Sequence, residues 1–182
     1  MKKSIYYSLL ISALMSVSVA EETRQVDKHE HGVGVLNIAT EGNSINFEFM
    51  IPGADIVGFE YKAKSDSDIA LVNAALTKFE QFDNIFMIPS PSNCALVDSK
   101  IKIDQGDEHD DHDEHDEEAH NEFVAHYSFN CGNVKEIDRI DFPYFNTFPN
   151  SGELEVQFVS GVGSTSFEVE GDKPFIDLKG KI

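Results

Sequence analysis

The fold is decided by the stretch VGVLNIATEGNSINFEFMI, which occupies residues 33–51. In both of its halves apolar and polar side chains alternate, and this alternation is typical of a strand with one buried face. Between the halves, Thr-Glu-Gly-Asn at 40–43 has the composition of a turn, since glycine adopts a positive φ without strain. The side chains predicted to face a core are Leu36, Ile38, Ile45, Phe47, Phe49 and Ile51. We therefore predict a β-hairpin that packs one face against a core.

Outside the hairpin, the same kind of pattern predicts five more strands. Their ranges are 95–103, 122–130, 154–158, 167–169 and 175–178. Residues 161–164 form the turn that joins the third of these strands to the fourth. Residues 142–149 are rich in aromatic side chains and contain two prolines, so they predict a short helix or a tight loop.

One segment has helical periodicity. Residues 66–82 follow Ser65, a good N-cap, and Asp68 stands at the capping-box position. Apolar side chains then recur at helical spacing, which predicts an amphipathic helix. These side chains are Ile69, Val72, Leu76 and Phe79.

The chain has 182 residues, the length of a single domain. Its predicted strands and helices do not alternate regularly, which disfavours a doubly wound parallel sheet. We therefore predict one α+β domain with a mostly antiparallel sheet, about seven strands and one or two helices.

Residues 1–20 have the pattern of a secretory signal peptide. Two lysines precede an apolar stretch at 5–19, and the small residues Ser18 and Ala20 stand at the −3 and −1 positions of a cleavage site. The alternative is a membrane anchor, which is disfavoured because a span needs about 20 apolar residues. We predict that residues 21–182 are exported as a single metal-binding domain with no membrane attachment after cleavage.

Cys94 and Cys131 are the only cysteines, so one intramolecular pairing is available to them. An exported protein matures in an oxidising compartment, where such a bond persists. No CxxC motif of the thioredoxin type is present. We predict a structural disulfide between the two cysteines, and we expect the strands that adjoin them to pair.

The segment between the cysteines includes residues 104–120, which read DQGDEHDDHDEHDEEAH. It contains ten acidic residues, four histidines and no basic residue. It has no apolar periodicity with which to bury a face, so we predict a disordered insert. Imidazoles among carboxylates suit Zn²⁺, Cu²⁺ and Ni²⁺, and the predicted ligands are His109, His112, His115 and His120. The alternative is a solvated acidic loop, but the interleaved histidines favour metal binding.

A second histidine pair, His29 and His31, stands just before the first strand. In an extended chain residues i and i+2 point to the same side, so both side chains can reach one ion. A third ligand must come from elsewhere, and His126 and Glu60 are the candidates. The parity of His126 turns it away from the predicted core. The alternative is a pair of exposed histidines in a frayed N-terminal segment.

The net charge is −19, from 33 acidic and 14 basic residues. Such a surface repels nucleic acids and anionic lipids, and it attracts cations. The sequence has neither the HExxH motif of zinc proteases nor the GxSxG motif of serine hydrolases, and the acidic insert does not follow the EF-hand pattern. We therefore expect a binder of divalent metal ions that is not an enzyme and has no nucleic-acid partner.

Several short motifs follow one another in a characteristic order. They are His29-Glu30-His31-Gly32, Val57-Gly58-Phe59-Glu60, Cys94 before a strand, Glu122-Phe123, Tyr127-x-Phe129-x-Cys131, and Phe148-Pro149 before Leu154-Glu155-Val156-Gln157. In this order the chain resembles the ZrgA-like periplasmic proteins, which are zinc-regulated and implicated in zinc acquisition in Gram-negative bacteria. Relatives often have histidine after the Phe-Glu pair and after the residue matching Phe123, where this chain has Tyr61 and Val124. His126 could substitute for the second of these.

The resemblance implies a periplasmic protein that binds several Zn²⁺ ions and contributes to zinc acquisition by handing the metal to an uptake system. A periplasmic zinc carrier or a zinc ABC importer would then be its partner. Two alternatives stay open. One is an acidic adaptor or structural module that grips a basic partner, and the other is a binder of Ni²⁺, Cu²⁺ or Ca²⁺.

Overall fold

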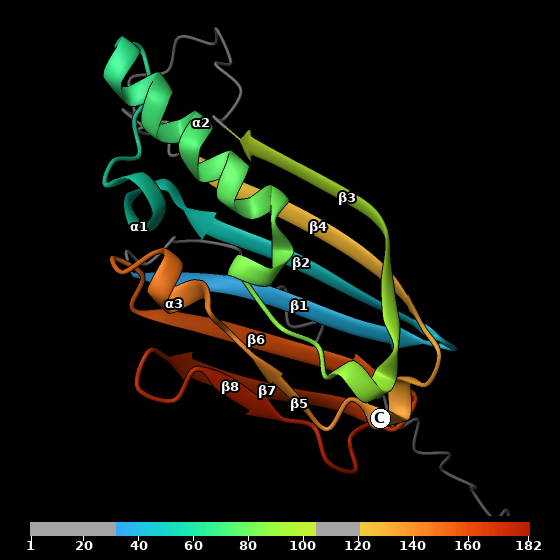
Figure 1. Cartoon of the computed structure of the whole chain (residues 1–182). Coiled ribbons are helices and arrows are strands. Elements are labelled where there is room, and N and C mark those ends of the chain that lie inside the picture. The colour runs from blue at the N-terminus through green and yellow to red at the C-terminus, as the bar shows by residue number, and fades with distance from the viewer. Residues whose placement is uncertain (1–31, 105–120) are drawn as a thin grey trace, which may run out of the picture.

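The computed structural model describes residues 32–104 and 121–182. The main strands are β1 (Val33–Glu41), β2 (Ser44–Pro52), β3 (Cys94–Asp104), β4 (Glu122–Cys131), β6 (Glu153–Ser160) and β7 (Gly163–Glu170). They form one sheet in the order β3-β4-β2-β1-β6-β7 (Figure 1). Neighbouring strands are antiparallel except β1 and β6, which are parallel. The prediction of a mostly antiparallel sheet is confirmed.

β1 and β2 form the predicted hairpin. Glu41 pairs with Ser44, so the turn between the strands contains only Gly42 and Asn43. Gly42 has a φ of +59°, a conformation that glycine adopts without a Cβ clash. All six apolar side chains predicted to face the core are buried. The period-two pattern of the hairpin therefore predicted its buried face correctly.

Helix α2 (Asp66–Glu80) lies across one face of the sheet (Figure 1). Its N-cap is as predicted, because the Ser65 hydroxyl accepts a hydrogen bond of 3.1 Å from the Asp68 N–H. The helix ends two residues before the predicted boundary and is followed by the 3₁₀ turn η1 (Phe82–Asn84). Its buried side chains are Val72, Ala75 and Phe79. Ile69 was expected to be buried, but it lies in the first turn and is 43% exposed.

Besides the 3₁₀ turns η2 (Ser90–Ser92) and η3 (Val134–Glu136), the fold has four other short elements. They are α1 (Gly53–Val57), α3 (Tyr144–Thr147), β5 (Arg139–Asp141) and β8 (Phe175–Asp177). α3 confirms the short helix predicted within 142–149, and β8 confirms the last predicted strand. β5 pairs with β8 in a separate two-stranded sheet. The pattern analysis missed α1 and β5, because elements of three to five residues are too short to show a period.

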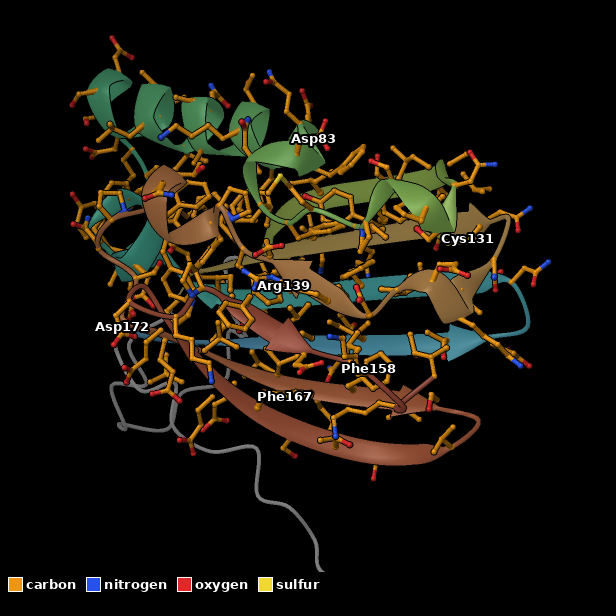
Figure 2. All side chains as sticks on the ribbon, turned by 60° about the horizontal axis from the view of Figure 1, so that its bottom comes forward. Asp83, Cys131, Arg139, Phe158, Phe167 and Asp172 are labelled. Atoms are coloured by element: carbon orange, nitrogen blue, oxygen red, sulfur yellow. A yellow bond between two sulfur atoms is a disulfide. The ribbon has the colours of Figure 1, made fainter. Side chains whose placement is uncertain are left out.

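The core lies between the sheet and the layer that contains α2, and aromatic side chains fill it (Figure 2). Phe47 of β2 stacks on Phe86 with ring centroids 4.1 Å apart. Burial of large rings stabilises the fold by about 25 cal/mol for each Å² removed from water. On the opposite face of the sheet, alternate positions of the strands carry polar side chains that are partly exposed, among them Asn37, Glu48 and His126.

The predicted disulfide between Cys94 and Cys131 is present, and the two cysteines are paired neighbours on β3 and β4. At the other end of the same strand pair, Asp104 pairs with Glu122. β3 thus includes the first residue of the predicted insert, and the rest of that insert lies outside the described residues. So do the predicted signal peptide and residues 21–31. Among the described residues, no helix is long and apolar enough to cross a membrane.

Candidate metal centre

The two described segments, 32–104 and 121–182, begin at the same end of the sheet. β1 begins at Val33 and β4 begins at Glu122, and this is the end where β2 finishes at Pro52. Pro52 is paired with Glu122 in the sheet. Gly32 and Asn121, which follow His31 and His120 in the sequence, therefore lie at one end of three adjacent strands. Figure 1 shows α1 beside this end of the sheet.

Gly32 is held in place by three hydrogen bonds. Its N–H donates to Asp55 Oδ1 over 2.9 Å, and its carbonyl accepts from the N–H groups of Gly152 and Glu153. Its φ of +90° lies in the region that favours glycine. A Cβ on Gly152 would come within 2.9 Å of the Gly32 carbonyl oxygen, so this close approach favours glycine at position 152. Asp55 lies on α1 and is only 3% exposed.

Asn121 is fastened to the segment around α1. Its N–H donates to the Glu60 carbonyl over 2.8 Å, and its side-chain Nδ2 donates to the Tyr61 carbonyl over 2.9 Å. Its own carbonyl accepts from the Gly53 N–H over 2.9 Å. Asn121 is 1% exposed, and its Oδ1 has no hydrogen-bond partner among the described residues. A Cβ on Gly53 would lie 1.5 Å from that oxygen, so only glycine fits there.

Glu60 reaches the same place because α1 ends abruptly. Gly58 has a φ of +85° and donates its N–H to the Ala54 carbonyl, which turns the chain out of the helix. Two residues later Glu60 is fixed through its backbone to Asn121, and its Oε1 is buried. We call Asp55, Glu60 and Asn121, together with Gly32, the end cluster.

The charge of Asp55 acts on the core. Burial raises the pKa of Tyr144, and the negative charge of Asp55 raises this pKa further. The Tyr144 hydroxyl is hydrogen-bonded to the Ser151 hydroxyl over 2.6 Å. Electrostatic interactions are stronger where water is excluded, so the charge of Asp55 is felt at the Tyr144 hydroxyl.

His126 lies elsewhere on the molecule. It points away from the core, as its parity predicted, and pairs across β4 and β2 with Glu48. Its Nδ1 lies 3.7 Å from Glu48 Oε1. It lies five positions after Asn121 in the chain, and at about 3.4 Å per residue along an extended strand this is about 17 Å. The fold therefore brings Glu60, but not His126, to the end where the chain enters after His31.

Asp55, Asn121 and Glu48 were not identified as candidates from the sequence. Asp55 had a signal, since it is a single acid in the otherwise apolar run from Ile51 to Val57. The other six candidate histidines lie outside the described residues: His29, His31, His109, His112, His115 and His120. Within 32–104 and 121–182, no group of three or more His, Cys, Asp or Glu side chains is placed to hold a metal. A metal site at the end cluster therefore needs ligands from the adjoining segments.

The family model described as ZrgA family zinc uptake protein matches residues 28–178 of the chain. The chain belongs to this family. The match includes the end cluster, the disulfide and the whole acidic insert, and it gives the protein a role related to zinc uptake. No curated protein is significantly similar to the chain.

The resemblance implied histidines at two positions that Tyr61 and Val124 occupy in this ZrgA-family chain. Tyr61 stacks on Phe59 with ring centroids 4.5 Å apart, and its carbonyl holds Asn121. Val124 lies on the outer face of β4, two residues from Glu122. Valine has no donor atom, and a tyrosine phenol is not among the usual ligands of zinc.

Proposed function

We propose that this ZrgA-family protein captures Zn²⁺ in the periplasm and passes it to an uptake system. The convergence at one end of the sheet carries the proposal. There the chain that follows His31 is bonded to Asp55, and the chain that follows His120 is bonded to the Glu60 carbonyl. His31 and His120 directly precede Gly32 and Asn121 in the sequence, and consecutive Cα atoms are about 3.8 Å apart.

The donor atoms available at this end suit zinc. Zn²⁺ binds imidazole nitrogens and carboxylate oxygens at about 2.0–2.2 Å, most often four ligands at once. The proposed ligands are His31, His120, Asp55 and Glu60. Hydrogen bonds already fix Gly32 and Asn121, so less conformational entropy is lost at these residues when an ion binds. A smaller entropy loss favours higher affinity.

We assign the remaining histidines a different part in the same function. A segment that wraps an ion loses backbone entropy, about 1–2 kcal/mol for each residue that it orders. His109, His112 and His115, within the acidic insert, and His29 should therefore bind further ions more weakly and release them faster. The insert then gathers zinc and the end cluster holds it, which is a binding role rather than a catalytic one.

Zinc titration of the mature chain against a competing chelator tests the end cluster. Asp55→Asn keeps the oxygen that accepts from the Gly32 N–H but removes the charge, and it should weaken the tightest site by at least about tenfold, or ~1.4 kcal/mol. Asp172→Asn is the matched control, because Asp172 is exposed in the turn between β7 and β8. Unchanged affinity in both Asp55→Asn and Glu60→Gln would place the tight site elsewhere.

A second variant separates the insert from the end cluster. Replacing residues 105–119 by a short Gly-Ser linker keeps His120 and the pairing of Asp104 with Glu122. We expect fewer bound ions with the tightest site retained. Loss of all zinc binding in this variant would instead show that the insert is the whole site and that the folded domain is only its scaffold.

A further inference from the structure

A row of polar side chains crosses the outer face of the sheet. Direct cross-strand pairing places one member on each of the six strands, and the members in order are Lys100, His126, Glu48, Asn37, Gln157 and Ser166. Directly paired residues project from the same face of a sheet. The row is therefore a continuous polar band at the middle of the sheet, away from the end cluster.

The central part of this row lies in a groove of about 410 Å³. Its polar lining is His126, Glu48, Asn37, Gln157, Asn46 and Ser128. Hydrogen bonds order the walls, since Ser128 donates to Asn46 and Ser166 donates to Gln157. The volume is in the range of sites that hold small ligands and is far larger than a single bare ion needs.

His126 and Glu48, the face pair, have the geometry of two metal ligands. The distance from His126 Nδ1 to Glu48 Oε1 is 3.7 Å, which is too long for a hydrogen bond. With bonds of about 2.0–2.1 Å, two ligands of a tetrahedral zinc ion stand about 3.3–3.4 Å apart. A shift of a few tenths of an ångström would therefore let one ion take both atoms.

A hydrogen bond orients the Glu48 carboxylate so that one oxygen faces His126. Asn37 Nδ2 donates to Glu48 Oε2 over 3.3 Å, which leaves Oε1 toward His126. Support of this kind from a neighbouring hydrogen bond is typical of metal ligands. Both side chains of the face pair are a little over two-fifths exposed, so an ion can reach them from the solvent.

We propose that the face pair is a second Zn²⁺ site, open and of low affinity, whose other two coordination positions point into the groove. Water fills these positions when zinc is bound and no partner is present, and a ligand on the molecule that delivers or removes zinc can replace it. Lys100, paired with His126 from the β3 side, is the one cation in the row and limits the affinity by repulsion. The inference does not depend on the end cluster, which lies about 17 Å away along β4.

Residue-resolved NMR of the mature chain during titration with zinc chloride tests the face pair. We expect the His126 imidazole signals to shift with zinc. Glu48→Gln should weaken this titration by at least about tenfold, ~1.4 kcal/mol. Lys100→Gln should strengthen it by about threefold, because it removes a positive charge beside the ion. Ser166→Ala, at the far end of the same row, is the control that should leave it unchanged.

Two results would overturn the proposal. One is that the His126 signals do not respond to zinc, and the other is that they respond equally in the natural chain and in Glu48→Gln. Backbone amide spectra of each variant show whether the sheet is intact. In Asp55→Asn the His126 titration should be unchanged, so failure of the face pair and failure of the end cluster are distinguishable.

Discussion

The end cluster and the face pair use similar donor atoms but are built in opposite ways. The end cluster combines residues from chain segments far apart in sequence, which hydrogen bonds hold together, and its members Asp55 and Asn121 are buried. The face pair needs only the register of two adjacent strands, and its side chains are half-exposed. A buried, prearranged site favours retention of an ion, whereas an open pair favours rapid exchange. On our two proposals, the end cluster would hold zinc and the face pair would exchange it.

The largest expected effect comes from the disulfide, which joins β3 to β4 at the end remote from Asn121. Replacing Cys94 and Cys131 together by Ala should lower the free energy of unfolding by about 3–4 kcal/mol, because the bond joins residues 37 positions apart and so restricts the unfolded chain. Urea unfolding measures this change. Zinc affinity of the end cluster should be kept under native conditions, since its hydrogen bonds do not involve the cysteines. A parallel loss of both would mean that the end cluster depends on the strand pair as a whole.

Zinc itself should stabilise the protein mainly through the end cluster. Free zinc at 100 times the dissociation constant of the tightest site should add about 2.7 kcal/mol to the free energy of unfolding. In Asp55→Asn the same zinc concentration should add much less, whereas Glu48→Gln should behave like the natural chain because its site is weak. Thermal or urea unfolding with and without zinc decides between these outcomes. Equal losses in the two variants would contradict the distinction between a holding site and an exchange site.

Gly53→Ala should disturb the end cluster alone. The new Cβ would lie 1.5 Å from Asn121 Oδ1 and 2.7 Å from the Phe59 carbonyl oxygen, so the backbone must shift. We expect a loss of about 1–3 kcal/mol of stability, together with weaker binding at the tightest zinc site. Gly161→Ala is the matched control, because nothing lies within 4 Å of a Cβ at that position. The His126 titration should be the same in both variants, and a change in it would show that the two regions are coupled.

The smallest effect should appear at alkaline pH, where one buried tyrosine reports on each region. Burial raises the pKa of Tyr127, which lies on β4 next to His126, and burial together with Asp55 raises the pKa of Tyr144. A raised folded-state pKa contributes stability that is complete below the unfolded pKa of about 10 and is lost as the pH rises further. For each tyrosine, the free energy of unfolding should fall by up to about 1.4 kcal/mol per pH unit above that value.

Absorbance of the phenolate form during a pH titration measures this effect. Tyr127→Phe should leave the titration of Tyr144 unchanged. Asp55→Asn should lower the pKa of Tyr144 and leave the pKa of Tyr127 unchanged. An ordinary titration of both side chains near pH 10 in the folded protein would contradict their burial.

The candidate site was only partly predictable from the sequence. Glu60 was identified as a carboxylate that could supply a third ligand to the His29 and His31 pair, and His126 as the one histidine outside the two clusters, with a parity that turns it away from the core. Asp55 and Asn121 were missed, since a single acid in an apolar run and an asparagine after an acidic insert are ambiguous until their partners are known. Glu48 was missed as well, because on its own it is the polar residue expected on the outer face of a strand.

Local periodicity in the sequence determined most of the elements, the buried parity of the hairpin, the cap of α2 and the availability of one disulfide. These features depend on residues close together in the chain or, for the disulfide, on there being only two cysteines. Only the tertiary structure decided that β1 pairs in parallel with β6, that Gly32 and Asn121 are each hydrogen-bonded to a residue of α1, and that His126 stands opposite Glu48. Which distant residues meet depends on strand order and register, and turn lengths and core packing over the whole chain set these together.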